Sequence, residues 1–299
     1  MSGGSVISPE DRRRLGAVAY RILGSFHDAE DVIQETQIRW SQLDAEQRSV
    51  IREPLAWLTR VASRIALDLL GSAASRREAS SGIWLPEPAP DEYLGVSHLA
   101  SDPSDLVALD ESISLALLVA METLTPAERV ALILHDSFGL PFEEIGRILG
   151  RTSAAARQLA SSARTRLRSR PADDPQSAAR DQVVLAFQQA CASGDVTALV
   201  AALAPDAVSR ADGGTHVVTA TRPIVGADNI ARYLLGLLSR EQSRTDVVSE
   251  IVQANGCSAV AVFSGQMPIA LLDLAVSHGR IREIAFIVDP EKLSVLRRR

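Results

Sequence analysis

Residues 140–168 read LPFEEIGRILGRTSAAARQLASSARTRLR, a stretch that predicts two helices joined by a tight turn. Apolar residues recur at helical spacing until Gly150, which sits at the turn. Thr152 or Ser153 then caps the second helix. Working outward from this pair, we expect an all-α domain over residues 110–170.

The second helix of the pair has two chemically different faces. Its inward stripe is apolar and mostly small: Ala156, Leu159, Ala160, Ala163 and Leu167. Its outward stripe carries Arg157, Ser161, Arg164 and Arg168. Small residues let a backbone approach closely, and arginines bond phosphates and guanine edges, so this helix suits the DNA major groove. The alternative interpretation is an ordinary helix with a solvated arginine face.

The distribution of charge favours DNA more than the total charge does. The chain has a net charge of -6 and a pI of about 5.5, which argues against a nucleic-acid partner. Between Arg147 and Arg170, however, every charged residue is arginine. Between Ser81 and Glu111 every charged residue is acidic. An acidic linker therefore separates two arginine-bearing segments.

The first third of the chain predicts a second all-α domain, over residues 8–78. Ser8 begins a helix as its N-cap, another runs over about 28–43, and Pro54 begins a third. We expect a polar loop before Pro54. The second helix has a polar, mostly acidic face made of Asp28, Asp31, Gln34 and Glu35. Such a face suits a basic partner surface, although most acidic helix faces are simply solvated.

Residues 79–109 have the composition of a linker, with one exception, GIWLPEP at 82–88. Trp84 and Leu85 are too apolar for a free tether, and the two prolines hold the backbone extended. We expect this segment to dock as a stiff strip. The alternative is a linker whose tryptophan only covers the edge of the first domain.

The last third, residues 178–299, predicts an α+β domain. Two helices, over about 178–193 and 196–203, precede alternating apolar segments, which we expect to form an antiparallel sheet. The expected strands are VVTATRPIV, DVVSEIVQA, CSAVAVF, PIALLDLAV and RIREIAFIV, with a further helix after the first of them. Cys191 and Cys257 lie in apolar settings, which favours small buried side chains over a disulfide.

At this point the motifs resemble a known family. DAEDVIQETQIRW followed by PLAWLTRVASRIALDLL resembles region 2 of bacterial RNA polymerase sigma factors of the extracytoplasmic-function (ECF) class. LTPAERVALILHDSFGLPFEEIGRILGRTSAAARQLASSARTRLR resembles region 4 of the same class. The order and spacing of both motifs agree over roughly residues 8–170.

The resemblance implies roles for particular residues. It places Asp28, Asp31, Gln34 and Glu35 against core RNA polymerase. It assigns the promoter −10 element to the loop at about 42–53 and to Arg60, Arg64, Arg76 and Arg77. It assigns the −35 element to Thr152, Ser153, Arg157, Ser161, Arg164 and Arg168. The chain departs from many relatives at Ser162, where arginine is common.

The C-terminal third resembles the SnoaL-like branch of the NTF2-like fold, which one ECF subfamily carries as an extension. Motifs of that subfamily match here as WLPEP at 84–88, DGGTH at 212–216 and DPEKL at 289–293. From the residues alone, the second is a turn signature and the third a helix start. The resemblance implies that the strip contacts the domain near one of these motifs. The residues expected in this regulatory contact are Trp84, Leu85, Pro86, Glu87, Pro88, Asp212, Gly213, Gly214, Asp289, Pro290, Lys292 and Leu293.

We therefore expect an alternative sigma factor that binds core polymerase and promoter DNA and is regulated in cis by its C-terminal domain. We expect no enzymatic activity, catalytic residue, metal site or cofactor, although a small ligand of unknown identity could bind. No leader and no apolar run of about 20 residues is evident, which predicts a cytoplasmic location without membrane contact. Two alternatives are a helix-turn-helix regulator with a ligand-sensing NTF2-like domain, and a SnoaL-like enzyme fused to a DNA-binding module.

Overall fold

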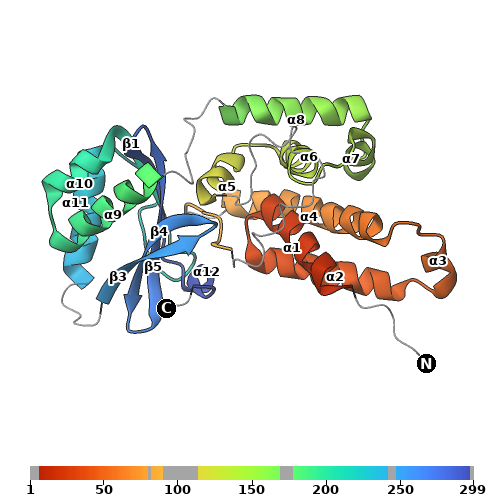
Figure 1. Ribbon diagram of the computed structural model, residues 1–299, viewed down its shortest axis with the longest axis horizontal. Helices are drawn as coiled ribbons and strands as arrows, with labels where there is room; N and C mark the ends of the chain where they lie inside the picture. Colours follow the sequence, from red (N-terminus) through yellow and green to blue (C-terminus); the bar gives the residue numbers. More distant parts are fainter. Residues whose placement is uncertain (1–6, 80–81, 90–113, 169–177, 242–246, 297–299) are drawn as a thin grey trace. The chain divides into compact units, whose positions relative to one another are not determined.

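The computed structural model describes residues 7–79, 82–89, 114–168, 178–241 and 247–296 (Figure 1). The chain divides into two compact units. Helices of the first unit are α1 (Pro9–Leu23), α2 (Phe26–Gln42), α3 (Ala45–Ser49), α4 (Pro54–Ala79), α6 (Pro126–Asp136), α7 (Phe142–Leu149) and α8 (Ser153–Arg168). The second unit holds residues 82–89, residues 114–119 at the start of α5 (Leu115–Met121), and all elements from α9 onward.

Helix α1 lies at the centre of the first unit. Every residue from Leu15 to Leu23 is buried, because α1 packs against α2, α4 and α6. The Arg21 guanidinium lies 5.4 Å from the centroid of the Phe138 ring. Burial lowers the pKa of Arg21 to about 10, so the side chain still carries its charge at neutral pH. The helices of the two predicted all-α regions thus share one core.

The expected start signal of α1 is confirmed, and a capping box also begins α6. The Ser8 hydroxyl accepts a hydrogen bond from the Asp11 amide at 3.0 Å. Thr125 and Glu128 form a reciprocal capping box at the start of α6. The expectation of a simple loop before Pro54 was wrong, because a second capping box, Asp44 with Gln47, begins the short helix α3.

Helices α7 and α8 form the expected helix-turn-helix. Gly150 ends α7 with φ of 64°, a left-handed conformation that glycine adopts without a steric penalty. Thr152 follows, and its hydroxyl accepts a hydrogen bond from the Ala155 amide at 3.2 Å. The two residues together reverse the chain within one short turn.

The second unit is an α+β domain built on one sheet. Its helices are α9 (Ala178–Ser193), α10 (Val196–Ala202), α11 (Ala227–Glu241) and α12 (Pro290–Leu293). Its strands are β1 (Leu203–Asp212), β2 (Ile224–Val225), β3 (Val247–Ala254), β4 (Cys257–Ser264), β5 (Met267–Ser277) and β6 (Arg280–Ile287), in the spatial order β2-β1-β6-β5-β4-β3.

Two expectations for this sheet need correction. Strand β1 was not expected, because Pro205 and Asp206 interrupt its alternation, and the expected strand at 217–225 shrinks to β2. The sheet is also not purely antiparallel, since β1 pairs with β6 in parallel. The return from β1 to β6 passes through α11 and the remaining strands, which is long enough for a parallel pairing.

The main core of this domain lies between one sheet face and helices α9, α10 and α11 (Figure 1). Val260, Leu272 and Phe286 stand in register across β4, β5 and β6 and pack toward this core. Cys191 and Cys257 are buried and are not joined in a disulfide, as expected. Burial raises the pKa of Cys191 to about 12, which keeps its thiol protonated and unreactive.

The described residues include neither a membrane-spanning helix nor a metal-binding cluster. No helix among them is long and apolar enough to cross a bilayer. Within the same residues, no three His, Cys, Asp or Glu side chains are grouped to hold a metal ion.

A buried arginine joins β4 to β5 where their pairing ends. The ladder between these strands stops at Val260 and Leu272. Just beyond it, the Arg180 guanidinium donates to the carbonyls of Ser258, at 2.6 Å, and Leu274, at 2.9 Å. Its Nη2 also lies 3.7 Å from the Asp273 carboxylate, and the Arg180 side chain is only 1% exposed. This side chain replaces strand pairing with its own hydrogen bonds.

Arg180→Met should therefore lower the free energy of unfolding of this domain by about 3 kcal/mol, because it leaves two carbonyls and a buried carboxylate without this donor. Urea denaturation measures the loss. Arg282→Met is the matched control, since Arg282 pairs with the exposed Asp206 at 3.3 Å, and a pair of that kind contributes less than about 1 kcal/mol. Equal losses in the two variants would contradict the bridging role of Arg180.

Candidate functional site

The outward face of α8 is the expected DNA-contacting surface, and its side chains fall into two groups. Arg157, Ser161 and Arg168 are exposed, as is Thr152 just before the helix. Ser153 and Arg164 are half-buried. Ala156, Ala160 and Ala163 are buried, so α8 rests on the domain through small residues.

Arg157 is supported from behind by two aromatic rings. Its guanidinium lies 5.3 Å from the centroid of the Phe142 ring, and Phe142 stacks on His135 with ring centroids 4.0 Å apart. The guanidinium therefore lies against an aromatic ring while the residue as a whole stays exposed, an arrangement that favours a fixed contact with a partner.

Arg164 is engaged within the protein. Its Nε donates to Asp136 Oδ2 at 2.8 Å, and its Nη2 bonds the other carboxylate oxygen. Hydrogen bonding to Asp136 raises the pKa of Arg164. A planar guanidinium matched to both oxygens of one carboxylate is among the stronger polar contacts in proteins. Sequence reasoning missed this pairing, because Asp136 lies on α6 and helical periodicity does not reveal which acid faces which arginine.

Glu128 forms a second link between α6 and α8. Its carboxylate accepts from Ser162 Oγ at 2.7 Å and from Arg166 Nη1 at 3.1 Å, in addition to the capping bonds with Thr125. Burial raises the pKa of Glu128, but these hydrogen bonds and the Arg166 charge outweigh it, so the pKa is lowered from 4.5. The ionised carboxylate therefore stabilises the fold above pH 4.5, and this contribution is lost as the pH falls through the lowered pKa.

The polar face of α2 lies where the resemblance requires an accessible surface. Asp31 and Gln34 are exposed, and Asp28 and Glu35 are half-buried. Glu35 bonds Arg39 Nε at 2.8 Å on the same helix. Ile38 lies next to this pair with 49% of its surface exposed. It adds an exposed apolar side chain to this face, which the sequence analysis had not singled out.

The arginines expected at the −10 element are placed differently from one another. Arg64 is exposed on α4, whereas Arg60 is half-buried, with its Nη2 3.0 Å from Glu144 Oε1 on α7. Arg76 and Arg77 belong to α4, but their side chains lie outside the described part of the structure. Within the first unit, then, one predicted DNA contact is already paired with a residue of the helix-turn-helix.

The strip at 82–89 packs onto the C-terminal domain. Leu85, Pro86, Glu87 and Pro88 are buried, and Trp84 is half-buried. The Leu85 amide donates to Asp212 Oδ2 at 2.7 Å. Four residues further on, the Ala89 amide donates to Asn255 Oδ1 at 2.9 Å. The strip is thus held through its backbone at two points, and it touches the DGGTH motif as expected.

Lys292 is the only lysine in the chain, and it fastens the strip from the other side. Its ammonium group donates to the Leu85 carbonyl and to Asp212 Oδ2, the latter at 2.7 Å. It also lies 4.4 Å from the centroid of the Trp84 ring. Because the side chain is only 7% exposed, these contacts form away from water. We call Trp84, Leu85, Asp212 and Lys292 the latch.

The glycines of DGGTH and the cap of DPEKL shape the surroundings of the latch. Gly214 has φ of 58°, and a Cβ there would lie 2.3 Å from Asp289 Oδ2, so only glycine fits. A Cβ on Gly213 would lie 2.0 Å from the Val217 carbonyl oxygen. Asp289 caps α12, in which Pro290 comes first and Lys292 and Leu293 are buried. DGGTH therefore forms a turn and DPEKL begins a helix, and both motifs also lie beside the strip, as the resemblance implied.

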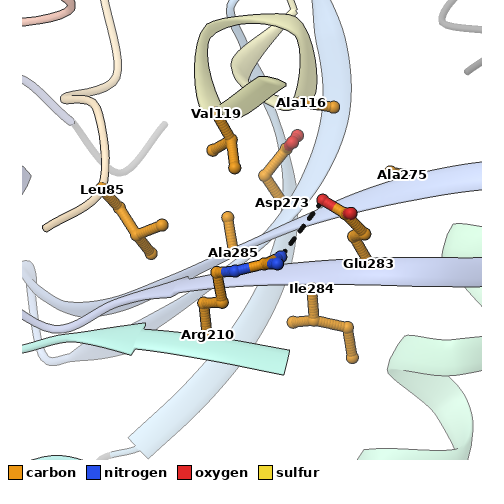
Figure 2. A pocket seen from close by; sticks show the side chains of 9 residues that line it. All are labelled: Leu85, Ala116, Val119, Arg210, Asp273, Ala275, Glu283, Ile284 and Ala285. Carbon is orange, nitrogen blue, oxygen red and sulfur yellow. Dashed lines mark ion pairs between the residues drawn. The ribbon is translucent and has the colours of Figure 1, made fainter. Parts of the chain in front are cut away.

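Residues 114–119, at the start of α5, also belong to this unit. Ala116 and Val119 of α5 line a pocket with Leu85 of the strip and with Arg210, Asp273 and Glu283 of the sheet (Figure 2). Figure 2 shows Leu85, Val119 and Ala116 above the strands, with Arg210 and Glu283 joined by an ion pair of 3.4 Å. The space, about 10 Å³, corresponds to roughly one water molecule. No sequence signal had placed residues 114–119 against the sheet.

Comparisons with known proteins agree with these features. The sigma-70 region 2 model matches residues 10–76, and the sigma-70 region 4 model matches residues 114–167. The chain is 37% identical to the ECF RNA polymerase sigma factor SigJ of Mycobacterium tuberculosis, covering 95% of this chain and 91% of SigJ. It is 35% identical to the probable ECF sigma factor SigI of the same species, covering 96% and 93%.

The crystal structure of Mycobacterium tuberculosis SigJ has the same fold, with a TM-score of 0.70 and 31% identity over 95% of this chain and 96% of that one. The expected order of two all-α regions and an α+β domain is confirmed. A conventional regulator or an enzyme with a DNA-binding module would not account for the match through region 2. The chain belongs to the ECF RNA polymerase sigma factor family, and it is an alternative sigma factor that directs transcription.

Proposed function

We propose that the C-terminal domain regulates this sigma factor in cis by holding both ends of the segment that connects region 2 to region 4. The observation that carries the proposal is that residues 82–89 and residues 114–119 both belong to the C-terminal unit. Leu85, Ala116 and Val119 line the same small pocket on its sheet (Figure 2). The connecting segment therefore starts and finishes on one surface.

This anchoring would limit how far apart region 2 and region 4 can lie. Residues 90–113, about 24 residues, could extend to roughly 80 Å if both ends were free. With both ends held on one domain, the separation of the two ends is set by that domain and not by the length of the segment. Promoter recognition needs region 2 and region 4 to engage two separate DNA elements, so a limit on their separation is a means of regulating it.

The latch supplies the stability that such a restraint needs. Its ion pair is buried, and removing one partner of a buried pair typically costs 3–5 kcal/mol. Release of the strip would break this pair's shared bonds to Leu85 and expose apolar side chains. The C-terminal domain is therefore suited to switch between holding and releasing the linker as a unit.

The surfaces of the sigma regions support specific partner contacts. Core RNA polymerase would bind the polar face of α2, through Asp31, Gln34 and their neighbours. The exposed Arg64 would contact the −10 element, and Arg60 would join it once Glu144 releases it. The exposed residues of α8 would read the −35 element.

The C-terminal domain is proposed as a regulatory rather than a catalytic module. The acids that an enzyme would need there are engaged in structural contacts. Asp212 holds Lys292 and the Leu85 amide, and Asp273 lies beside the buried Arg180. His278 occupies a turn with φ of 52°. These contacts support a binding role for the face that carries them.

Trp84→Ala should change promoter-dependent transcription in the same direction as removal of residues from about 175 onward, because both free the strip. Transcription by the reconstituted holoenzyme measures the effect, and both variants should still bind core polymerase. Val218→Ala is the control, since Val218 is 99% exposed on the same domain. Wild-type activity of Trp84→Ala beside an altered truncation would show that the strip plays no part in regulation.

Lys292→Met should increase the hydrogen-exchange rate of the Leu85 amide by at least about 100-fold, because Asp212 would be left as an uncompensated buried charge. Exchange measured by mass spectrometry over residues 82–89 detects this opening. Glu291→Gln on the same helix should not alter it, because Glu291 is 74% exposed. Unchanged protection in Lys292→Met would mean that the lysine does not fasten the strip.

A further inference from the structure

The four arginines of α8 are not equivalent. Arg164 is bonded to Asp136 and Arg166 to Glu128, and both acids lie on α6. Within the described residues, Arg157 and Arg168 form no ion pair and are exposed. Half of the positive charge on this helix is therefore neutralised from within the protein.

The two acids hold α8 on opposite flanks of its buried stripe. With 3.6 residues per turn, the stripe of Ala156, Ala160 and Ala163 has Arg164 on one side and Ser162 and Arg166 on the other. Asp136 holds the first flank and Glu128 the second. Contacts on both sides prevent the helix from rolling on its alanine stripe, so the residues facing outward are fixed.

The exposed residues of α8 are not the same set that the resemblance assigns to the −35 element. The exposed residues are Ala154, Arg157, Gln158, Ser161, Thr165, Arg166 and Arg168. Gln158 lies next to Arg157 near the middle of this face and was not among the expected contacts. Arg164 lies at the margin of the face. It is half-buried, and its guanidinium bonds the Asp136 carboxylate.

We propose that Gln158, together with Arg157, determines −35 specificity, and that Asp136 and Glu128 are positioning residues that withhold Arg164 and Arg166 from DNA. The inference deepens the proposed function and rests on α8 being the −35 reader. The chemistry is complementary, because a glutamine amide pairs with an adenine edge and an arginine with a guanine edge in the major groove. To reach DNA, Arg164 would have to give up two charge-assisted hydrogen bonds.

The experiment compares holoenzymes that carry Arg157→Gln, Gln158→Ala or Arg164→Gln on promoters with every single-base substitution in the −35 element. Gln158→Ala should reduce discrimination at one base pair by about 5- to 150-fold, and Arg157→Gln at another. Arg164→Gln should leave the order of base preferences as in the wild type. If Gln158→Ala keeps the wild-type profile, or Arg164→Gln changes it, the proposal is overturned. If Arg157→Gln and Gln158→Ala both keep it, α8 does not read the −35 element and the proposed function fails instead.

Asp136→Asn tests the positioning role separately, because it frees Arg164 while keeping the shape of the side chain. The freed arginine should gain a phosphate contact, so the salt dependence of promoter binding should steepen by about 0.9 in the slope of log K against log salt. Asp136→Asn with Arg164→Gln should return the slope to the wild-type value. A contribution of Asp136 to folding alone would lower the stability without steepening the slope, and that result would overturn the positioning role.

Discussion

The buried contact between Lys292 and Asp212 holds the strip on the C-terminal domain. A lysine and an aspartate pair inside the C-terminal domain, and the backbone of Leu85 bonds to both. An ion pair removed from water is stable only when its remaining hydrogen-bonding positions are filled. Here a peptide group and the face of Trp84 help to fill them. The strip therefore forms part of the environment that stabilises the ion pair.

Ion pairs also determine which arginines of the sigma regions remain available to a partner. Seven arginines between residues 147 and 170 suggest a uniformly basic surface. The acids of α6 divide them, because Asp136 and Glu128 bond two of those on α8. Glu144 does the same to Arg60 within the same unit. Charge pairing therefore reduces a broad basic patch to a small set of exposed side chains.

Local sequence patterns predicted the features that depend on neighbouring residues, such as helix starts and turns. They failed for contacts between residues that are far apart in the sequence. Capping residues and the Gly150 turn located α1 and the helix-turn-helix, since each depends on a few neighbouring residues. Strand β1 was missed because Pro205 and Asp206 interrupt its alternation and because its parallel partner β6 lies far along the chain. The apolar residues of WLPEP predicted that it docks, but only the family motifs predicted where it docks. The role of Asn255 was not anticipated, because a turn residue gives no sign that its side chain accepts a bond from Ala89.

Anchoring both ends of the inter-region segment has an entropic consequence. A segment whose two ends are fixed on one domain closes a loop, and the entropic cost of closure grows only slowly, by about 0.6 kcal/mol for each doubling of length. The segment between Ala89 and Ser114 can therefore gain or lose many residues with little effect on the stability of the domain that holds it. Under the proposed regulation, the length of the segment would be set by the distance between the two DNA elements and not by the stability of the domain.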